Sequence, residues 1–114
     1  MEKFIKQPHY LSFLSQYSQL TLGFTTREDG KSPYPSHSFN MARYIDDEPS
    51  HVTNHQKILA DSINFPTQHW VFPIQTHGNK IAHITKAHRG INIYSLGKEL
   101  HGIDGMYTYD SDIL

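Results

Sequence analysis

The stretch of sequence that decides the expected fold is Trp70-Val71-Phe72-Pro73-Ile74-Gln75-Thr76-His77-Gly78. It begins with aromatic and aliphatic residues, a composition that favours a buried strand. It ends with an amide, a hydroxyl, an imidazole and a glycine in succession. An apolar run that fixes the backbone and presents polar groups at its end is a common way to build a site. His77 is therefore the first candidate functional residue, although a histidine near a strand end is more often a hydrogen-bonded structural residue.

The segments after this stretch predict further strands. Gly78-Asn79 is typical of a hairpin turn, and residues 80–85 alternate polar and apolar side chains as an antiparallel strand does. Residues 103–108 contain strand-forming side chains beside a glycine, so we expect another strand there. We interpret Ile113-Leu114 as the start of one more strand.

One helix is expected, at residues 49–63. The acidic residues Asp46-Asp47-Glu48 precede it, where they complement the helix dipole and cap free amides. Pro49 suits the first turn of a helix, and Asn64-Phe65-Pro66 ends the pattern. The stripe expected to face a sheet consists of Val52, Gln56, Leu59 and Ile63, flanked by Ile58.

The N-terminal part predicts two strands followed by a long loop. Pro8 prevents one continuous helix in residues 1–18, so a short strand and a turn are expected. Residues 20–26 are rich in β-branched and aromatic side chains, which favours a second strand. Prolines and small polar residues make residues 28–44 irregular, and loops of this length tend to be functional or disordered. The aromatic residues in this loop favour packing over disorder.

The composition excludes several classes of protein. A chain of 114 residues fits one domain or part of one. A net charge of −1 provides no field that recruits nucleic acid or acidic membranes. The absence of cysteine excludes a disulfide framework and a thiolate nucleophile within these residues. No apolar run approaches a membrane span and the first residues do not resemble a signal peptide, so a cytoplasmic protein is expected.

Four polar residues invite a functional interpretation. His51 and His55 would share a helix face, as a metal pair does, but an exposed helix face is the simpler interpretation because no zinc-protease motif surrounds them. Arg27 could clamp an anion, and Asn40 could bind an amide-like or base-like edge. The alternative for these two is structural: Arg27 pairs with a nearby carboxylate, and Asn40 holds its own loop together.

Five motifs occur in the order found in one known family. They are Gly23-Phe24-Thr25-Thr26-Arg27, Ser38-Phe39-Asn40-Met41, Asp47-Glu48-Pro49 with Val52 and Asn54, Gln75-Thr76-His77-Gly78, and Asp104-Gly105-Met106-Tyr107-Thr108. On these motifs the sequence resembles the YfiH family, also called the laccase-domain or polyphenol oxidase family, which includes the mammalian purine-metabolism enzyme FAMIN. The sequence departs from the family pattern at Ala42 and Tyr44, where glycine and histidine are frequent.

The resemblance implies an α+β fold with mixed β-sheets flanked by helices. Residues 1–114 would form the N-terminal part of a single YfiH-like domain that continues beyond residue 114, and they would be inactive alone. The implied function is that of a cytoplasmic enzyme for purine nucleosides and phosphate: phosphorolysis of adenosine, inosine or methylthioadenosine, and deamination of adenosine. The alternatives are a copper-dependent polyphenol oxidase of the laccase type and a non-catalytic interaction module.

The resemblance also implies a zinc site, or alternatively a copper site, held by a histidine, a cysteine and a second histidine. His77 matches the first ligand and would be both catalytic and metal-binding. The cysteine and the second histidine belong to motifs that would lie beyond Leu114. Gln75 and Asn40 would contact the nucleoside or support the residues that do, and Arg27 would bind phosphate or brace its loop.

Overall fold

The computed structural model describes residues 3–13, 19–33 and 36–114 of the chain. The chain divides into two compact units. The first comprises Met1–Met41 and Asp47–Leu59, and the second comprises Ala42–Asp46 and Ala60–Leu114. In the part of the chain that the structure describes, no helix combines the length and the apolar character needed to cross a membrane. That residues 1–114 belong to one domain stays a prediction.

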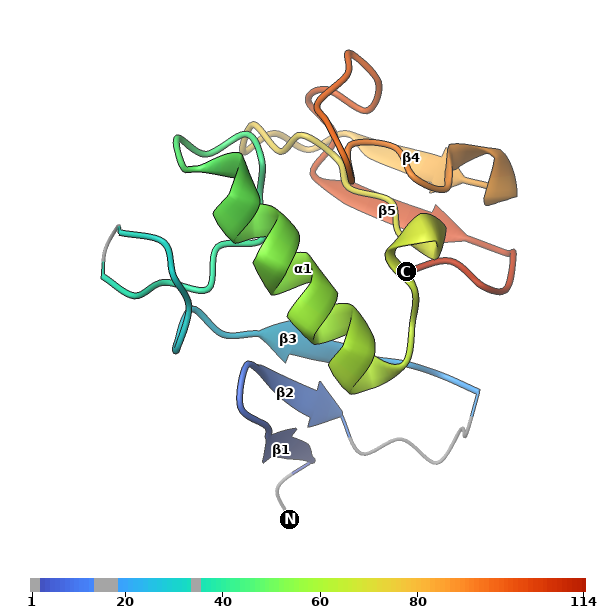
Figure 1. Ribbon diagram of the computed structural model, residues 1–114. Helices are drawn as coiled ribbons and strands as arrows, with labels where there is room; N and C mark the ends of the chain where they lie inside the picture. The colour runs from blue at the N-terminus through green and yellow to red at the C-terminus, as the bar shows by residue number, and fades with distance from the viewer. Residues whose placement is uncertain (1–2, 14–18, 34–35) are drawn as a thin grey trace. The chain divides into compact units, whose positions relative to one another are not determined.

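The first unit contains a three-stranded antiparallel sheet in the order β1-β2-β3 (Figure 1). Its strands are β1 (Phe4–Lys6), β2 (Tyr10–Phe13) and β3 (Gly23–Thr25). Phe4 lies opposite Phe13, and the two rings meet edge to face with their centroids 5.2 Å apart. The strand expected at residues 20–26 is thus present but shorter. Part of the strand and turn expected within residues 1–18 lies outside the described residues.

The expected helix is confirmed as α1 (Pro49–Ile63), drawn in green in Figure 1. Val52, Gln56 and Leu59 are buried and Ile63 is half-buried, as the spacing of the stripe predicts. Local signals therefore decide both ends of the helix. They are the proline at its start and the Asn-Phe-Pro sequence after its end.

His55 corrects the expectation that the histidines of this helix lie on an exposed face. Its side chain is 1% exposed and packs against the ring of Phe39, with centroids 4.7 Å apart. Its Nε2 accepts the backbone N–H of Lys31 at 2.9 Å, and its Nδ1 donates to the carbonyl of Asn40 at 2.8 Å. These two bonds suit a neutral imidazole with its proton on Nδ1. Helical spacing alone could not show this, because the burial comes from a loop that is distant in sequence.

The run from Trp70 to Ile74 is buried as expected except for Phe72, which is half-buried. It does not form a strand, so the prediction of a strand is wrong. Its backbone hydrogen bonds go to several separate segments, at residues 90–91, 100–102 and 114. Ile74 makes a single parallel bridge with His101. Pro73 has no N–H group to donate, which prevents a continuous ladder along the run.

The core of the second unit forms around this run. Trp70 is 2% exposed, and its indole Nε1 donates to the carbonyl of Phe65 at 2.9 Å. A buried tryptophan needs such a partner because its N–H would otherwise lose hydration without compensation. The other apolar side chains buried in this unit include Val71, Pro73, Ile74, Ile84, Ile93 and Ala60.

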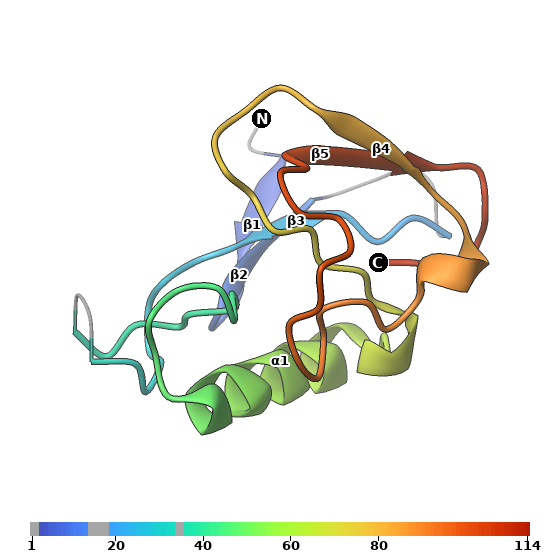
Figure 2. The same cartoon turned by 90° about the horizontal axis from the view of Figure 1, so that it is seen from above.

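The second unit also contains a two-stranded parallel sheet, β4 (Ile81–Ile84) with β5 (Gly105–Thr108), which Figure 2 shows. The strands expected at residues 80–85 and 103–108 are confirmed as β4 and β5. The antiparallel pairing expected for residues 80–85 is wrong, because β4 pairs with β5 in parallel, and so is the hairpin turn at Gly78-Asn79. Parallel strands need a long connection, and here it includes η2 (Lys86–His88), while η1 (Thr67–His69) follows α1. The combination of antiparallel and parallel sheets with α1 confirms the expected α+β fold with mixed sheets.

Candidate functional site

A carboxylate holds the loop that carries His77. Asp104 directly precedes β5, and its Oδ1 accepts the backbone N–H of His77 at 2.9 Å while its Oδ2 accepts that of Gly78 at 2.8 Å. The backbone nitrogen of Thr76 lies 3.5 Å from Oδ2, a distance at which a hydrogen bond is weak and contributes little to holding the loop. Two of the motifs that are separated in the sequence, residues 75–78 and 104–108, therefore meet at Asp104.

The backbone of His77 adopts an unusual conformation at this point. Its φ angle is 60°, in the left-handed region that residues with a side chain rarely adopt. Successive N–H groups that converge on one anion supply the local bonds that hold such a turn. The N–H groups of Gly78 and His77, in that order, keep the pKa of Asp104 below its usual value, so the carboxylate is ionised at neutral pH.

The imidazole of His77 is exposed and makes no hydrogen bond to another described residue. A ring without internal partners, carried on an anchored backbone, suits a ligand position. Across residues 3–13, 19–33 and 36–114, however, no three histidine, aspartate or glutamate side chains gather closely enough to hold a metal ion. Catalytic zinc sites normally use three protein ligands. The described residues thus fit one ligand position of such a site and do not complete it.

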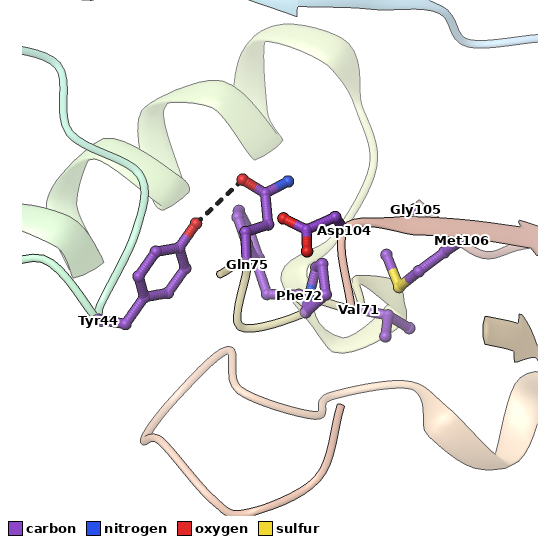
Figure 3. A pocket seen from close by; sticks show the side chains of 8 residues that line it. Tyr44, Val71, Phe72, Gln75, Asp104, Gly105 and Met106 are labelled. Atoms are coloured by element: carbon purple, nitrogen blue, oxygen red, sulfur yellow. Dashed lines mark hydrogen bonds between the residues drawn. The ribbon is translucent and has the colours of Figure 1, made fainter. Parts of the chain in front are cut away.

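A pocket in the second unit lies beside this loop (Figure 3). Its volume of about 340 Å³ falls in the usual range for small-molecule sites. Its lining is mostly apolar with three polar side chains, and it consists of Tyr44, Val71, Phe72, Pro73, Gln75, Asp104, Gly105 and Met106. Asp104 both lines this pocket and anchors the backbone of His77, so the two features share one residue.

Tyr44 and Gln75 are joined on the wall of this pocket. The Tyr44 hydroxyl donates to Oε1 of Gln75 at 3.2 Å, the dashed line in Figure 3. Burial raises the pKa of Tyr44, a backbone hydrogen bond with Gln75 acts to lower it, and the negative charge of Asp104 acts to raise it, so the phenol remains a proton donor at neutral pH. Gln75 was a predicted substrate contact, and the structure places it on the pocket wall. Tyr44 was noted only as a departure from the family pattern.

Asn40, in the first unit, belongs to a hydrogen-bonded cluster around Asp47. Its Nδ2 donates to Oδ2 of Asp47 at 2.9 Å, and the hydroxyl of Ser32 donates to the same oxygen. The backbone N–H of Glu48 and Nδ1 of His51 approach Oδ1 at 2.7 and 3.1 Å. Although burial acts to raise it, these hydrogen bonds keep the pKa of Asp47 well below its usual range. The contacts fit the structural alternative for Asn40, in which it holds its own loop together.

Arg27 also belongs to the first unit. Its side chain is exposed, and its carbonyl accepts the N–H of Phe39 at 2.9 Å. Among the described residues its guanidinium has no carboxylate partner within ion-pair distance. The described residues therefore do not support the structural alternative, in which Arg27 pairs with a carboxylate. The guanidinium is open to an anion. Of the predicted site residues, the structure brings Gln75 and His77 together in the second unit.

Comparison with known proteins identifies the class to which the chain belongs. Residues 21–114 match the family described as multi-copper polyphenol oxidoreductase laccase. The chain therefore belongs to this laccase-domain family, the YfiH family that its motifs resemble.

Curated relatives with the same name occur in several staphylococci. The chain is 59% identical to the purine nucleoside phosphorylase of Staphylococcus epidermidis RP62A and 57% identical to that of Staphylococcus aureus COL. It is 52% identical to that of Staphylococcus saprophyticus. Each match includes 99% of this chain but only 43–44% of the relative. The chain thus spans less than half the length of the curated relatives it matches.

Two solved structures share the fold. The hypothetical protein YfiH of Bacillus licheniformis superposes with a TM-score of 0.88 at 32% identity, over 99% of this chain and 42% of that one. YlmD from Geobacillus stearothermophilus gives a TM-score of 0.87 at 29% identity, over 99% of this chain and 43% of that one.

Proposed function

We propose that the full-length gene product is a cytoplasmic purine nucleoside phosphorylase that uses a purine nucleoside and phosphate. The observation that carries this proposal is the 59% identity, over 99% of the chain, to a relative named purine nucleoside phosphorylase. Because the chain covers 43% of that relative, the activity is proposed for the whole protein, and residues 1–114 alone are expected to be inactive.

Phosphorolysis requires a base and an anion to be held on either side of the sugar. The glycosidic C–N bond breaks, a C–O bond to phosphate forms, and the departing base takes up a proton. Holding the reactants in line removes much of the entropic barrier. The pocket of Gln75 and Asp104 supports binding of the base, because apolar walls with a few polar groups suit a heterocycle. The open guanidinium of Arg27 supports a role in binding phosphate, and Asn40 is proposed as a second contact to the nucleoside.

We also propose His77 as a metal ligand, with zinc as the metal and copper as the alternative. The exposed and unbonded ring of His77 supports this role. A bound zinc ion supplies Lewis-acid polarisation. The remaining ligands, a cysteine and a second histidine by family resemblance, are not part of these residues. Within the chain, Asp104 fixes the backbone of His77 and so limits the directions that the ring can take.

Three other functions are kept as alternatives. Adenosine deamination is a further activity that the resemblance implies for the same site. A copper-dependent polyphenol oxidase is favoured by the description of the matching family. A non-catalytic interaction module would use the histidines and aromatic residues for packing and partner contacts.

These functions are separated by assays of the metal-loaded full-length protein with inosine plus phosphate, with adenosine, and with a phenol. We expect phosphate-dependent release of hypoxanthine that is lost in His77→Asn, together with a loss of bound zinc measured by elemental analysis. His37→Asn is the matched control, because His37 is also an exposed histidine with a positive φ, 47° against 60° for His77. Turnover of phenol without release of hypoxanthine would favour the oxidase.

A further inference from the structure

One face of the parallel sheet in the second unit is apolar and exposed. Alternate side chains of a strand point to the same face, and the register places His83 opposite Tyr107 and Ile81 opposite Gly105. The exposed fraction is 68% for Ile81, 50% for Tyr107 and 86% for Tyr109, which follows β5 directly. The side chains of Ile81, His83, Tyr107 and Tyr109 are called the outer face of this sheet below.

The three rings of the outer face form one cluster. His83 and Tyr107 stack with their centroids 5.0 Å apart and their planes 10° from parallel. Tyr109 meets both rings edge to face, at 5.4 Å from His83 and 5.8 Å from Tyr107. Ile81 lies over Gly105, where a Cβ would come within 3.4 Å of the isoleucine side chain. Tyrosine therefore predominates on this face, and tyrosine is enriched in the buried centres of protein interfaces.

The pairing of β4 with β5 explains why a bare outer face is unusual. The opposite face of the sheet packs inward, with Ile84 2% exposed and Ala82, Met106 and Thr108 half-buried. Parallel sheets almost always have both faces covered, and two strands alone are marginally stable. A parallel pair that buries one apolar face and exposes the other therefore lacks one of its covering layers.

We propose that the outer face of β4 and β5 is a docking surface for the part of the full-length chain that lies outside residues 1–114. The chain corresponds to only 43% of the relative that it matches at 59% identity, so more than half of a protein of that length is available to supply the layer. The docking segment should be apolar, with polar groups placed for the two phenol hydroxyls.

A second copy of the chain is a less suitable occupant of the outer face. A stable interface between two proteins uses about 20–30 residues on each side, far more than the four of this face. A covalently linked segment needs fewer contacts, because its effective concentration is in the millimolar range. The inference concerns how the full-length protein is assembled and goes beyond the proposed reaction.

Hydroxyl-radical footprinting of the full-length protein, read by mass spectrometry, tests whether the outer face is covered. We expect Tyr109 to be oxidised about tenfold more slowly in the native protein than in urea, because its exposed fraction falls from 86% to that of a buried side chain. Ile81→Lys should lower the thermal midpoint by about 5–10 °C if the face is covered and change it little if the face is exposed. Ile81→Val is the matched control, because it keeps an apolar side chain at the same position and should stay within about 3 °C of the native protein.

Photo-crosslinking identifies the occupant of the outer face. The crosslinker p-benzoylphenylalanine is placed at position 109 in isotopically light and heavy full-length chains that are refolded together. We expect crosslinks to peptides outside residues 1–114, and only within one chain. Crosslinks between light and heavy chains would assign the face to a second copy and overturn the inference. Crosslinks confined to residues 1–114 would also overturn it, as would oxidation of native Tyr109 at the rate of the unfolded chain.

Release of hypoxanthine from inosine by the native protein is measured separately and tests phosphorolysis. A protein that protects Tyr109 but releases no hypoxanthine keeps the docking surface and loses the proposed reaction. A protein that releases hypoxanthine but leaves Tyr109 unprotected keeps the reaction and loses the docking surface.

Discussion

The carboxylate of Asp104 accepts the backbone N–H of His77 at 2.9 Å, and this bond joins the two motifs of the second unit, residues 75–78 and 104–108, that contain the candidate residues Gln75 and His77 and their anchor Asp104. It acts on the main chain and leaves the imidazole exposed. The backbone of His77 is held at a φ of 60° by this bond and by the neighbouring one to Gly78. The direction in which the ring can reach a ligand therefore depends on a residue that does not touch the ring's donor atoms.

Asp104→Asn is expected to weaken binding of metal through His77 without removing a ligand. An amide has one acceptor oxygen in place of two, and its NH₂ group faces the N–H donors of the loop. Changes in groups that orient a metal ligand typically cost about 10- to 100-fold in affinity. Zinc affinity of the full-length protein, measured by competition with a chelator, tests this expectation. Asp61→Asn, an exposed aspartate of α1, is the control, and equal affinities for the two variants would contradict the role of Asp104.

Asp47 is expected to make the stability of the first unit depend on acid pH. Its pKa in the folded protein lies well below the unfolded value of about 3.9, so its contribution is fully present above that pH and is lost as the pH falls further. Asp47→Asn should therefore be less stable at pH 7, by about 2–4 kcal/mol, because several hydrogen bonds to a buried charge are lost. The variant should also lose less stability than the native protein between pH 4 and pH 2. Urea unfolding at a series of pH values measures both effects, and parallel curves for the two proteins would exclude this account.

His55→Ala is expected to destabilise the first unit by about 2–4 kcal/mol. The substitution leaves the N–H of Lys31 and the carbonyl of Asn40 without their partners and opens a cavity beside Phe39. Hydrogen exchange at the amide of Lys31, measured by NMR, should become faster because this amide donates to His55. His101→Ala, which changes an exposed histidine, is the control. An unchanged exchange rate at Lys31 would show that the imidazole does not protect this amide.

The sequence predicted α1 to its ends because the signals for a helix are local. A proline at the start, a stripe at helical spacing and an Asn-Phe-Pro sequence after the end lie within a short window. The sheet around residues 70–85 was predicted wrongly because its partners are distant. β4 pairs with β5 rather than with the run that precedes Gly78. Pro73 was visible as a warning, since a proline cannot donate within a ladder.

Only the part of the candidate site that is local in the sequence could be predicted. Gln75 and His77 are neighbours in the sequence and stand out by their chemistry. Asp104 and Tyr44 reach them from other segments, and no spacing rule connects residues so far apart. The aspartate directly before the glycine of β5 was a usable signal, because a carboxylate at the start of a strand is well placed to bind the N–H groups of a neighbouring loop. His55 was misjudged because helical spacing does not reveal a covering loop.

Asn92 is expected to join the buried run from Trp70 to Ile74 to the segment at residues 97–99. Its side chain is buried, its Nδ2 donates to the carbonyls of Phe72 and Glu99 at 2.9 and 3.0 Å, and its Oδ1 accepts the N–H of Gly97 at 2.9 Å. Its φ is 62°, so Asn92→Gly keeps the backbone relaxed while it removes these bonds, and Asn92→Ala adds backbone strain to the same loss.

We expect Asn92→Gly to lose about 2–3 kcal/mol of stability and Asn92→Ala to lose about 1 kcal/mol more. Thermal unfolding measures the difference between the variants, and hydrogen exchange at Gly97 reports the lost acceptor directly. If the glycine variant were as stable as the native protein and protected Gly97 equally, the buried amide would be dispensable. The segments around Phe72 and Gly97 would then be held by their apolar contacts alone.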